Sequence, residues 1–142
     1  MSVRKAERSE GKLQALKLAK DLCVYTHTLC KNQECFPKNQ RWLLTSKIAQ
    51  EAVDVLSCVS SANSVTMRKG STTKAEFEYR HMKQVEALSH IASLFSLMQV
   101  AEDMNGIPER KIEYWTGIAD NAYTTIRKWM NADKERFNSY YS

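Results

Sequence analysis

Cys23, His27 and Cys30 come closest, by residue type and spacing, to a metal site. They stand at positions i, i+4 and i+7 of a predicted helix, so their side chains share one face as helical metal ligands do. No fourth ligand is evident, since Cys35 belongs to a predicted connection. Reduced cysteines are also common core residues, so the pattern favours buried thiols. We therefore expect no metal and no cofactor.

The two other histidines do not indicate catalysis. His81 and His90 are separated by about two and a half turns of one predicted helix and so point to different sides. We expect solvated or capping roles for both. The acidic residues around Glu102 and Glu109 are most simply helix-end and surface residues. With no nucleophile, base or ligand set in recognisable spacing, we expect a protein that is not an enzyme.

The basic residues form the one pattern that indicates a function. In an antiparallel bundle the end of the second helix adjoins the start of the third, and the end of the fourth reaches the same end of the bundle. Basic residues from these segments should therefore gather into a surface that attracts phosphates. Tyr79 offers a stacking surface there. The alternative is that these cations only keep a helical surface soluble, with Glu76 and Glu78 nearby. The candidate nucleic-acid-binding residues are Lys38, Arg41, Arg68, Lys69, Lys74, Arg80, Lys83, Arg127 and Lys128.

Hydrophobic periodicity predicts the elements that position these residues. Apolar residues recur at steps of three and four in four segments, which predicts four amphipathic helices. The first spans 11–31, with Ala15, Leu18, Leu22, Tyr25 and Leu29 buried; the second spans 38–65, with Leu44, Ile48, Ala52, Val55, Val59 and Ala62; the third ends near 104, with Phe77, His81, Val85, Leu88, Ile91 or Ala92, Phe95 and Met98; the fourth starts at Pro108, with Ile112, Trp115, Ala119, Ala122, Ile126 and Trp129.

Helix-breaking and helix-capping residues mark where these helices start and stop. Phe36-Pro37 ends any preceding helix, because proline lacks an N–H and disfavours helical geometry in the residue before it. Thr72 or Thr73 can cap the third helix, and Glu76 stands in capping-box register with Thr73. Asn105-Gly106 is a typical helix C-cap. These signals predict an all-α, up-down-up-down antiparallel four-helix bundle.

Composition agrees with one helical domain. The chain has 142 residues with only 4 glycines and 2 prolines, and its formal net charge is +5. We expect a single domain over 1–142, with a flexible basic arm at 1–10 and a loose tail at 139–142. The N-terminus lacks the apolar run of a signal peptide, and no stretch has the length of a membrane span. We therefore expect a cytoplasmic protein that does not enter membranes.

Several short motifs resemble one family of helical bundles. They are Phe36-Pro37-Lys38-Asn39-Gln40-Arg41 leading into Leu43-Leu44-Thr45, Ser61-Ala62-Asn63, Lys74-Ala75-Glu76-Phe77, and Ile126-Arg127-Lys128-Trp129. Together they resemble the superfamily of the accessory variability determinant (Avd) proteins of diversity-generating retroelements and the ribosomal-RNA intervening-sequence proteins. The Phe-Pro-Lys-x-x-Arg motif and the late tryptophan favour the Avd branch. The fourth helix lacks the paired glycines often found in that branch and has Thr124-Thr125 nearby instead.

The resemblance implies a homopentameric, barrel-like assembly with a basic surface. Such an assembly binds the retroelement's reverse transcriptase and its template RNA or complementary DNA during mutagenic cDNA synthesis. The alternative is an oligomeric scaffold of the intervening-sequence type, whose main role is protein–protein interaction and whose charge is incidental.

Overall fold

The computed structural model describes residues 5–140 and shows four long helices and, within that range, no strand. The α-helices are α1 (Lys5–Lys31), α2 (Ser46–Asn63), α3 (Lys74–Asn105) and α4 (Glu109–Tyr140). Two short helical segments precede α2, the 3₁₀ turn η1 (Lys38–Gln40) and the π turn η2 (Arg41–Thr45). The predicted all-α four-helix architecture is confirmed.

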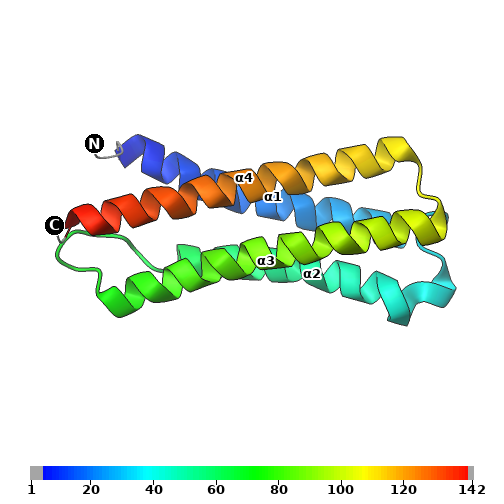
Figure 1. Cartoon of the computed structure of the whole chain (residues 1–142), viewed down its shortest axis with the longest axis horizontal. Helices are drawn as coiled ribbons and strands as arrows, with labels where there is room; N and C mark the ends of the chain where they lie inside the picture. Colours follow the sequence, from blue (N-terminus) through cyan, green and yellow to red (C-terminus); the bar gives the residue numbers. More distant parts are fainter. Residues whose placement is uncertain (1–4, 141–142) are drawn as a thin grey trace.

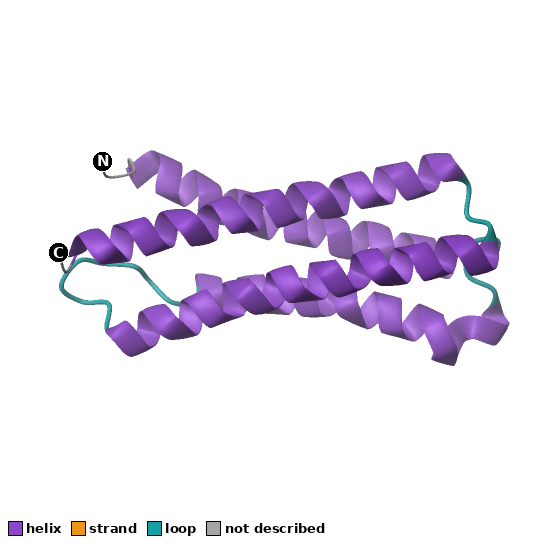
Figure 2. Ribbon diagram, in the orientation of Figure 1, coloured by secondary structure: helices purple, strands orange, loops and turns teal. Residues whose placement is uncertain are grey.

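The four helices lie side by side and alternate in direction (Figure 1). α1 packs against α2 and α4, and α3 packs against the same two helices. The connection 64–73 joins α2 to α3 at one end of the bundle, whereas the connections before α2 and before α4 lie at the other end (Figure 2). Segments 32–45 and 105–111 therefore meet at a single end, here called the α1–α2 end.

Local signals start and stop α3 as predicted. The Thr73 hydroxyl accepts a hydrogen bond from the Glu76 N–H at 3.1 Å, and the Glu76 carboxylate accepts one from the Thr73 N–H at 3.0 Å. This capping box satisfies two N–H groups at the start of the helix. At the other end Gly106 adopts φ +61°, and its N–H donates to the Glu102 carbonyl at 3.0 Å. The predicted capping box and glycine C-cap are both confirmed.

The second helix is not the continuous α-helix predicted over 38–65. A 3₁₀ turn and a π turn precede it, and the Ser46 N–H bonds to the Arg41 carbonyl across five residues. The first complete α-helical turn therefore begins at Ser46, and the helix ends at Asn63. Within the π turn Leu44 is buried together with the stripe of α2, whereas Trp42 and Leu43 are exposed.

Two predicted irregular segments are partly helical. α1 begins at Lys5, so residues 5–10 of the predicted arm belong to the helix. α4 runs to Tyr140, so residues 139–140 of the predicted tail are helical as well. Residues 1–4 and 141–142 of these two segments lie outside the described residues. A continuing run of helix formers without proline explains why neither helix stops earlier.

The core lies along the bundle axis. In α2 and α4 every predicted stripe residue is buried, and in α1 Ala15, Leu22 and Leu29 are, whereas Leu18 and Tyr25 are only partly covered. Alanines on all four helices occupy core positions, which allows the helix backbones to approach one another.

The predicted stripe of α3 is wrong over its first half. The buried residues there are Arg80, Gln84 and Ala87, whereas His81 and Leu88 are half-buried and Val85 is exposed. Apolar residues occur around the whole helix, so hydrophobicity did not identify the inner face. A polar contact with α4, described below, turns Arg80 and Gln84 inward.

None of the described helices has the length and apolarity needed to cross a bilayer.

Candidate nucleic-acid interface

The predicted basic residues do not form one cluster. Lys38 and Arg41 lie at the α1–α2 end, whereas Arg68 and Lys69 lie in the connection at the opposite end. The 18 residues of α2 separate these two groups, which corresponds to about 27 Å of helix axis. All four side chains are exposed, and none forms an ion pair within the described part of the chain.

Arg80 is a core residue, which corrects the prediction that it contacts nucleic acid. Its side chain is 3% exposed. Its Nε and Nη2 donate to the Asp133 carboxylate at 2.6 and 2.9 Å, and its Nη1 donates to the Val65 carbonyl at 2.6 Å. The guanidinium also stacks over the Trp129 ring. With its hydrogen bonds satisfied inside the bundle, Arg80 has no surface to offer a phosphate.

Two further predicted cations are paired with carboxylates. Lys74 lies 4.0 Å from Glu78, and Lys83 lies 3.1 Å from Glu86. The hydrogen bond between Lys83 and Glu86 raises the pKa of the lysine and lowers the pKa of the glutamate. These carboxylates reduce the local positive potential at the start of α3. The Lys83 side chain is largely covered, whereas Lys74 remains exposed beside its carboxylate.

Arg127 and Lys128 are exposed but do not join the cluster at the 64–73 connection. Asp133 lies near the 64–73 connection, because it binds Arg80, which also binds the Val65 carbonyl. Arg127 precedes Asp133 by six residues, so it lies about 9 Å further along α4 toward the middle of the bundle. The two residues therefore occupy the side of the bundle rather than its end.

Three cationic side chains line a surface pocket at the α1–α2 end. It has a volume of about 340 Å³, and none of the residues found to line it is acidic. Its cationic side chains come from Lys31 at the end of α1, Lys38 in η1 and Arg41 in η2. The remaining lining residues are His27, Cys30, Gln33, Phe36, Pro37 and Thr45. We call this the basic pocket.

Buried contacts hold the chain around the basic pocket in place. Phe36 is 3% exposed, and its ring meets the Trp115 ring edge-on at 6.2 Å. The Trp115 indole N–H donates to the Thr26 hydroxyl at 2.9 Å, inside the core. The Asn105 amide donates to the Cys35 carbonyl at 2.8 Å and accepts from Gln40 at 2.6 Å. Helices α1, α3 and α4 thus all anchor the segment that supplies Lys38 and Arg41.

The pocket also contains an unsatisfied polar group. The Thr45 hydroxyl oxygen is buried without a hydrogen-bond partner among the described residues. Sequence reasoning missed Thr45, Lys31 and His27 as members of this site. Their shared position near the Phe36-Pro37 turn was the one available signal.

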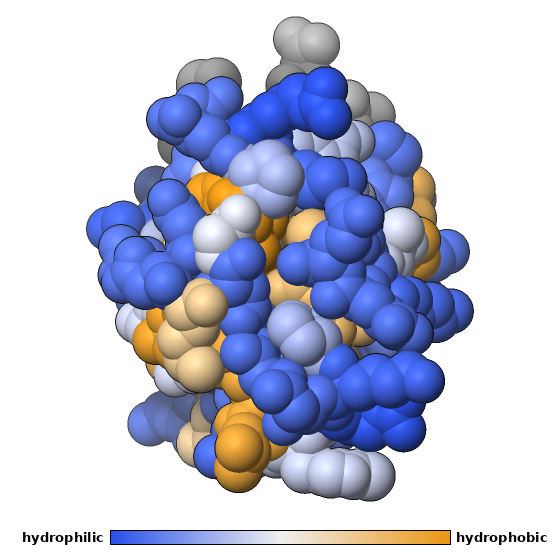
Figure 3. All heavy atoms as spheres, turned by 90° about the vertical axis from the view of Figure 1, so that its right-hand side faces the viewer, coloured by the Kyte–Doolittle hydropathy of each residue, from blue (hydrophilic) through white to orange (hydrophobic). Residues whose placement is uncertain are grey.

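Two large apolar side chains project beside the pocket. Trp42 is 79% exposed and Leu43 is 76% exposed, and both belong to the π turn η2. Figure 3 views the bundle from this end, where a mostly hydrophilic surface is interrupted by hydrophobic patches.

Cys23, His27 and Cys30 do not converge on a metal position. His27 Nδ1 lies 2.8 Å from the Cys23 carbonyl oxygen and 3.7 Å from its sulfur, whereas the Cys30 sulfur lies 4.0 Å from the Thr45 carbonyl oxygen. Burial raises the pKa of Cys30 to about 12 and also raises the pKa of Cys23. Burial thus disfavours the thiolate, which is the form of cysteine that binds metal ions. Among the described residues, a different set converges: Glu51, Asp54 and His90.

Comparison with known proteins yields no relative. The chain matches no protein-family model, no curated protein and no solved structure at a significant level.

Proposed function

We propose that this protein is a non-enzymatic, nucleic-acid-binding bundle whose main contact is the basic pocket. The observation that carries the proposal is the convergence of Lys31, Lys38 and Arg41 on one pocket with no acidic lining residue. Cations without carboxylate partners release condensed counterions when they meet phosphates, and this release drives binding.

Trp42 supplies the second part of the proposed interface. Nucleic-acid-binding proteins combine a positive groove with aromatic side chains on which bases stack. Trp42 is the most exposed of the large hydrophobic residues in the described part of the chain, and it directly follows Arg41. A single strand whose phosphate occupies the pocket would place a neighbouring base within reach of the indole. We therefore propose single-stranded RNA or complementary DNA as the ligand.

The family resemblance favours a retroelement setting for this activity. Five of the residues that carry the resemblance are lining residues of the basic pocket: Phe36, Pro37, Lys38, Arg41 and Thr45. We propose that the protein is an Avd-like accessory subunit that holds template RNA or cDNA beside a reverse transcriptase, as a homo-oligomer. A reverse transcriptase gene with a nearby repeated segment next to this gene would support the setting; a position within a ribosomal-RNA gene would contradict it.

Three charge-reversal variants test the pocket directly. Lys38→Glu/Arg41→Glu alters the pocket, whereas Arg68→Glu/Lys69→Glu and Arg127→Glu/Lys128→Glu alter the two other exposed groups. All three carry the same net charge, so a general electrostatic effect would weaken all of them equally. Affinity for single-stranded RNA is measured by filter binding over a salt series.

We expect the pocket variant to lose the most affinity. Its plot of log affinity against log salt should become shallower by about 0.7 for each phosphate of a single strand that the variant no longer neutralises. Trp42→Ala should weaken binding by about 1–3 kcal/mol without changing the slope. Equal losses in all three reversal variants, or binding that is insensitive to salt, would contradict the proposal.

A second candidate function is protein docking by the same end of the bundle. Adjacent exposed Trp42 and Leu43 are unusual on a surface that only contacts solvent. If this end docks a protein or a second copy, Leu43→Ser should lower the molar mass found by light scattering or abolish partner binding. If it contacts nucleic acid, Leu43→Ser should change neither, whereas Lys38→Glu/Arg41→Glu should abolish RNA binding.

A further inference from the structure

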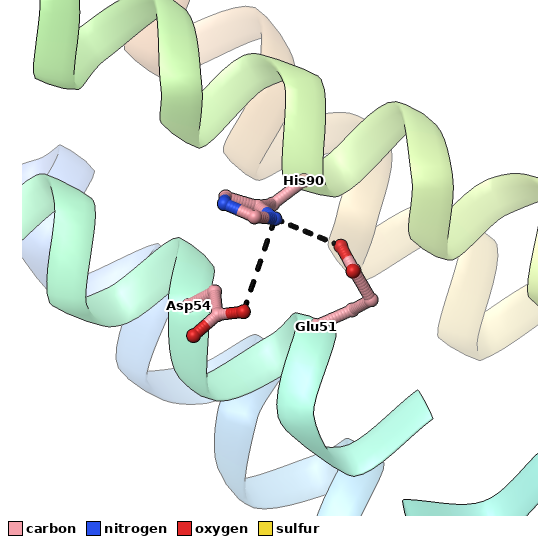
Figure 4. A group of neighbouring side chains, drawn as sticks. All are labelled: Glu51, Asp54 and His90. Carbon is pink, nitrogen blue, oxygen red and sulfur yellow. Dashed lines mark hydrogen bonds and ion pairs between the residues drawn. The ribbon is translucent and has the colours of Figure 1, made fainter. Parts of the chain in front are cut away.

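A second site lies on the seam between α2 and α3, away from the basic pocket. Glu51 and Asp54 stand one turn apart on α2, and His90 reaches toward both from α3 (Figure 4). His90 Nδ1 lies 2.9 Å from a Glu51 carboxylate oxygen and 4.0 Å from an Asp54 carboxylate oxygen. We propose that these three side chains form a binding site for a divalent transition-metal ion, with Zn²⁺ the best fit.

The distances suit a metal ion with little rearrangement. Bonds of about 2.0–2.1 Å in a tetrahedral Zn²⁺ site place two ligand atoms about 3.3 Å apart. The observed separations of 2.9 and 4.0 Å bracket this value. All three ligand atoms lie within 4.8 Å of one another, so rotation of the Glu51 and Asp54 side chains would bring them around one ion.

The charge of the site also favours a cation. The two carboxylates carry two negative charges, and no lysine or arginine of the described residues pairs with either. The nearest lysine on the facing part of α3, Lys83, is bound to Glu86 instead. A divalent ion would balance the two negative charges.

The surroundings orient one ligand. The Gln50 amide donates to Asp54 Oδ1 at 2.9 Å, which leaves Oδ2 directed at His90. A hydrogen bond of this kind to a ligand carboxylate is the usual support of a protein metal site. The side chains of Glu51, Asp54 and His90 are 22%, 34% and 32% exposed. Solvent therefore reaches the site, and water would complete the coordination.

The ligand types distinguish the metal. Imidazole nitrogen is a good ligand for Zn²⁺ and its first-row neighbours, whereas Mg²⁺ and Ca²⁺ prefer oxygen alone. A bound Zn²⁺ would join α2 to α3 by coordinate bonds at mid-bundle, in place of the hydrogen bond between His90 and Glu51. It would thereby stabilise the native bundle by binding only to the folded state.

The test uses the full chain, freed of metal by a chelator and titrated calorimetrically with ZnCl₂. We expect one Zn²⁺ per chain, with MgCl₂ failing to compete. His90→Gln and Asp54→Asn should each weaken binding by about tenfold or more, whereas His81→Gln, a change to another half-buried histidine of α3, should not. Glutamine can still donate a hydrogen bond to Glu51, so weaker binding in His90→Gln would not reflect the absence of that hydrogen bond.

Co²⁺ used as a spectroscopic substitute separates this site from the cysteines. Nitrogen and oxygen ligands should give visible d–d bands without the near-ultraviolet sulfur-to-cobalt band that Cys23 would produce. A sulfur band, Zn²⁺ binding unchanged in both His90→Gln and Asp54→Asn, or equal affinity for Mg²⁺ would each overturn the proposal. If His90→Gln lacks the wild-type circular dichroism, Glu51→Gln replaces it in the same comparison.

Discussion

Arg80 and Asp133 form a buried ion pair that joins the first part of α3 to the last part of α4. Their side chains are 3% and 2% exposed, and two parallel hydrogen bonds of 2.6 and 2.9 Å connect them. The Gln84 amide donates to the same carboxylate at 2.8 Å. This pair holds the bundle together beneath the 64–73 connection and removes one predicted cation from the surface.

Asp133→Asn should destabilise the bundle strongly. The substitution leaves the Arg80 guanidinium buried without its counter-charge, and such losses cost about 3–5 kcal/mol. The free energy of unfolding, measured by urea denaturation, should fall by about this amount. Asp120→Asn, on the exposed side of α4, is the matched control. A loss of about 1 kcal/mol or less, typical of an exposed pair, would show that Arg80 and Asp133 are not a buried unit.

Gly106→Ala and Gly117→Ala should change stability in opposite directions. Neither added methyl group would meet another atom within 4 Å, so packing does not distinguish them. Gly106 adopts φ +61° at the C-cap of α3, where alanine costs about 1–2 kcal/mol. Gly117 lies inside α4, where alanine stabilises by about 0.5–1 kcal/mol. Midpoints of thermal unfolding would reveal the two signs, and stabilisation by Gly106→Ala would refute the assignment of Gly106 as the cap.

The bundle should lose stability as the pH falls below 6.5 in part because of His81. Burial is the main cause that lowers the pKa of His81 from 6.5, and the nearby Lys134 adds to it. The native state therefore disfavours the protonated ring, and the unfolded state binds more protons at pH values between the lowered pKa and 6.5. By linkage, the free energy of unfolding decreases with decreasing pH in this window.

A His81→Phe variant isolates this contribution. The side chain stacks on Phe77 with ring centroids 5.9 Å apart, so phenylalanine retains the aromatic contact. Wild type and variant are compared by urea denaturation at several pH values from neutral to acidic. The pH dependence should be smaller in the variant; identical slopes would exclude His81 as a source of the acid sensitivity.

Cys30 should resist alkylation. Its pKa of about 12, raised by burial from 9.0, lowers the thiolate fraction at pH 8 about a thousandfold, since each pKa unit is a factor of ten. Time-resolved mass spectrometry of the iodoacetamide-treated protein should show Cys30 reacting far more slowly than in the urea-unfolded chain. Rapid modification of Cys30 in the folded protein would mean that α1 opens at its C-terminal end.

Much of the fold followed from local chemistry in the sequence. The stripes of α2 and α4, the Thr73 capping box and the Gly106 cap depend only on residues within a few positions of one another. The same spacing of three and four residues also places Arg80 and Asp133 on the buried faces of α3 and α4, although both residues are charged. Arg80, Gln84, Ala87, Ile91, Leu94, Met98 and Ala101 follow one another at steps of four and three, and Asp133 continues the α4 stripe four residues after Trp129.

The sequence alone therefore determined the helices, their order and their antiparallel packing, because helical periodicity and capping act over single turns. Only the tertiary structure decided which basic residues are exposed and which charges meet. Arg80 turns inward because a carboxylate 53 positions away is buried opposite it. The basic pocket forms because residues of η1 and η2 lie beside the end of α1. Contacts of this kind depend on the relative placement of whole helices, and no local pattern of residue types encodes that placement.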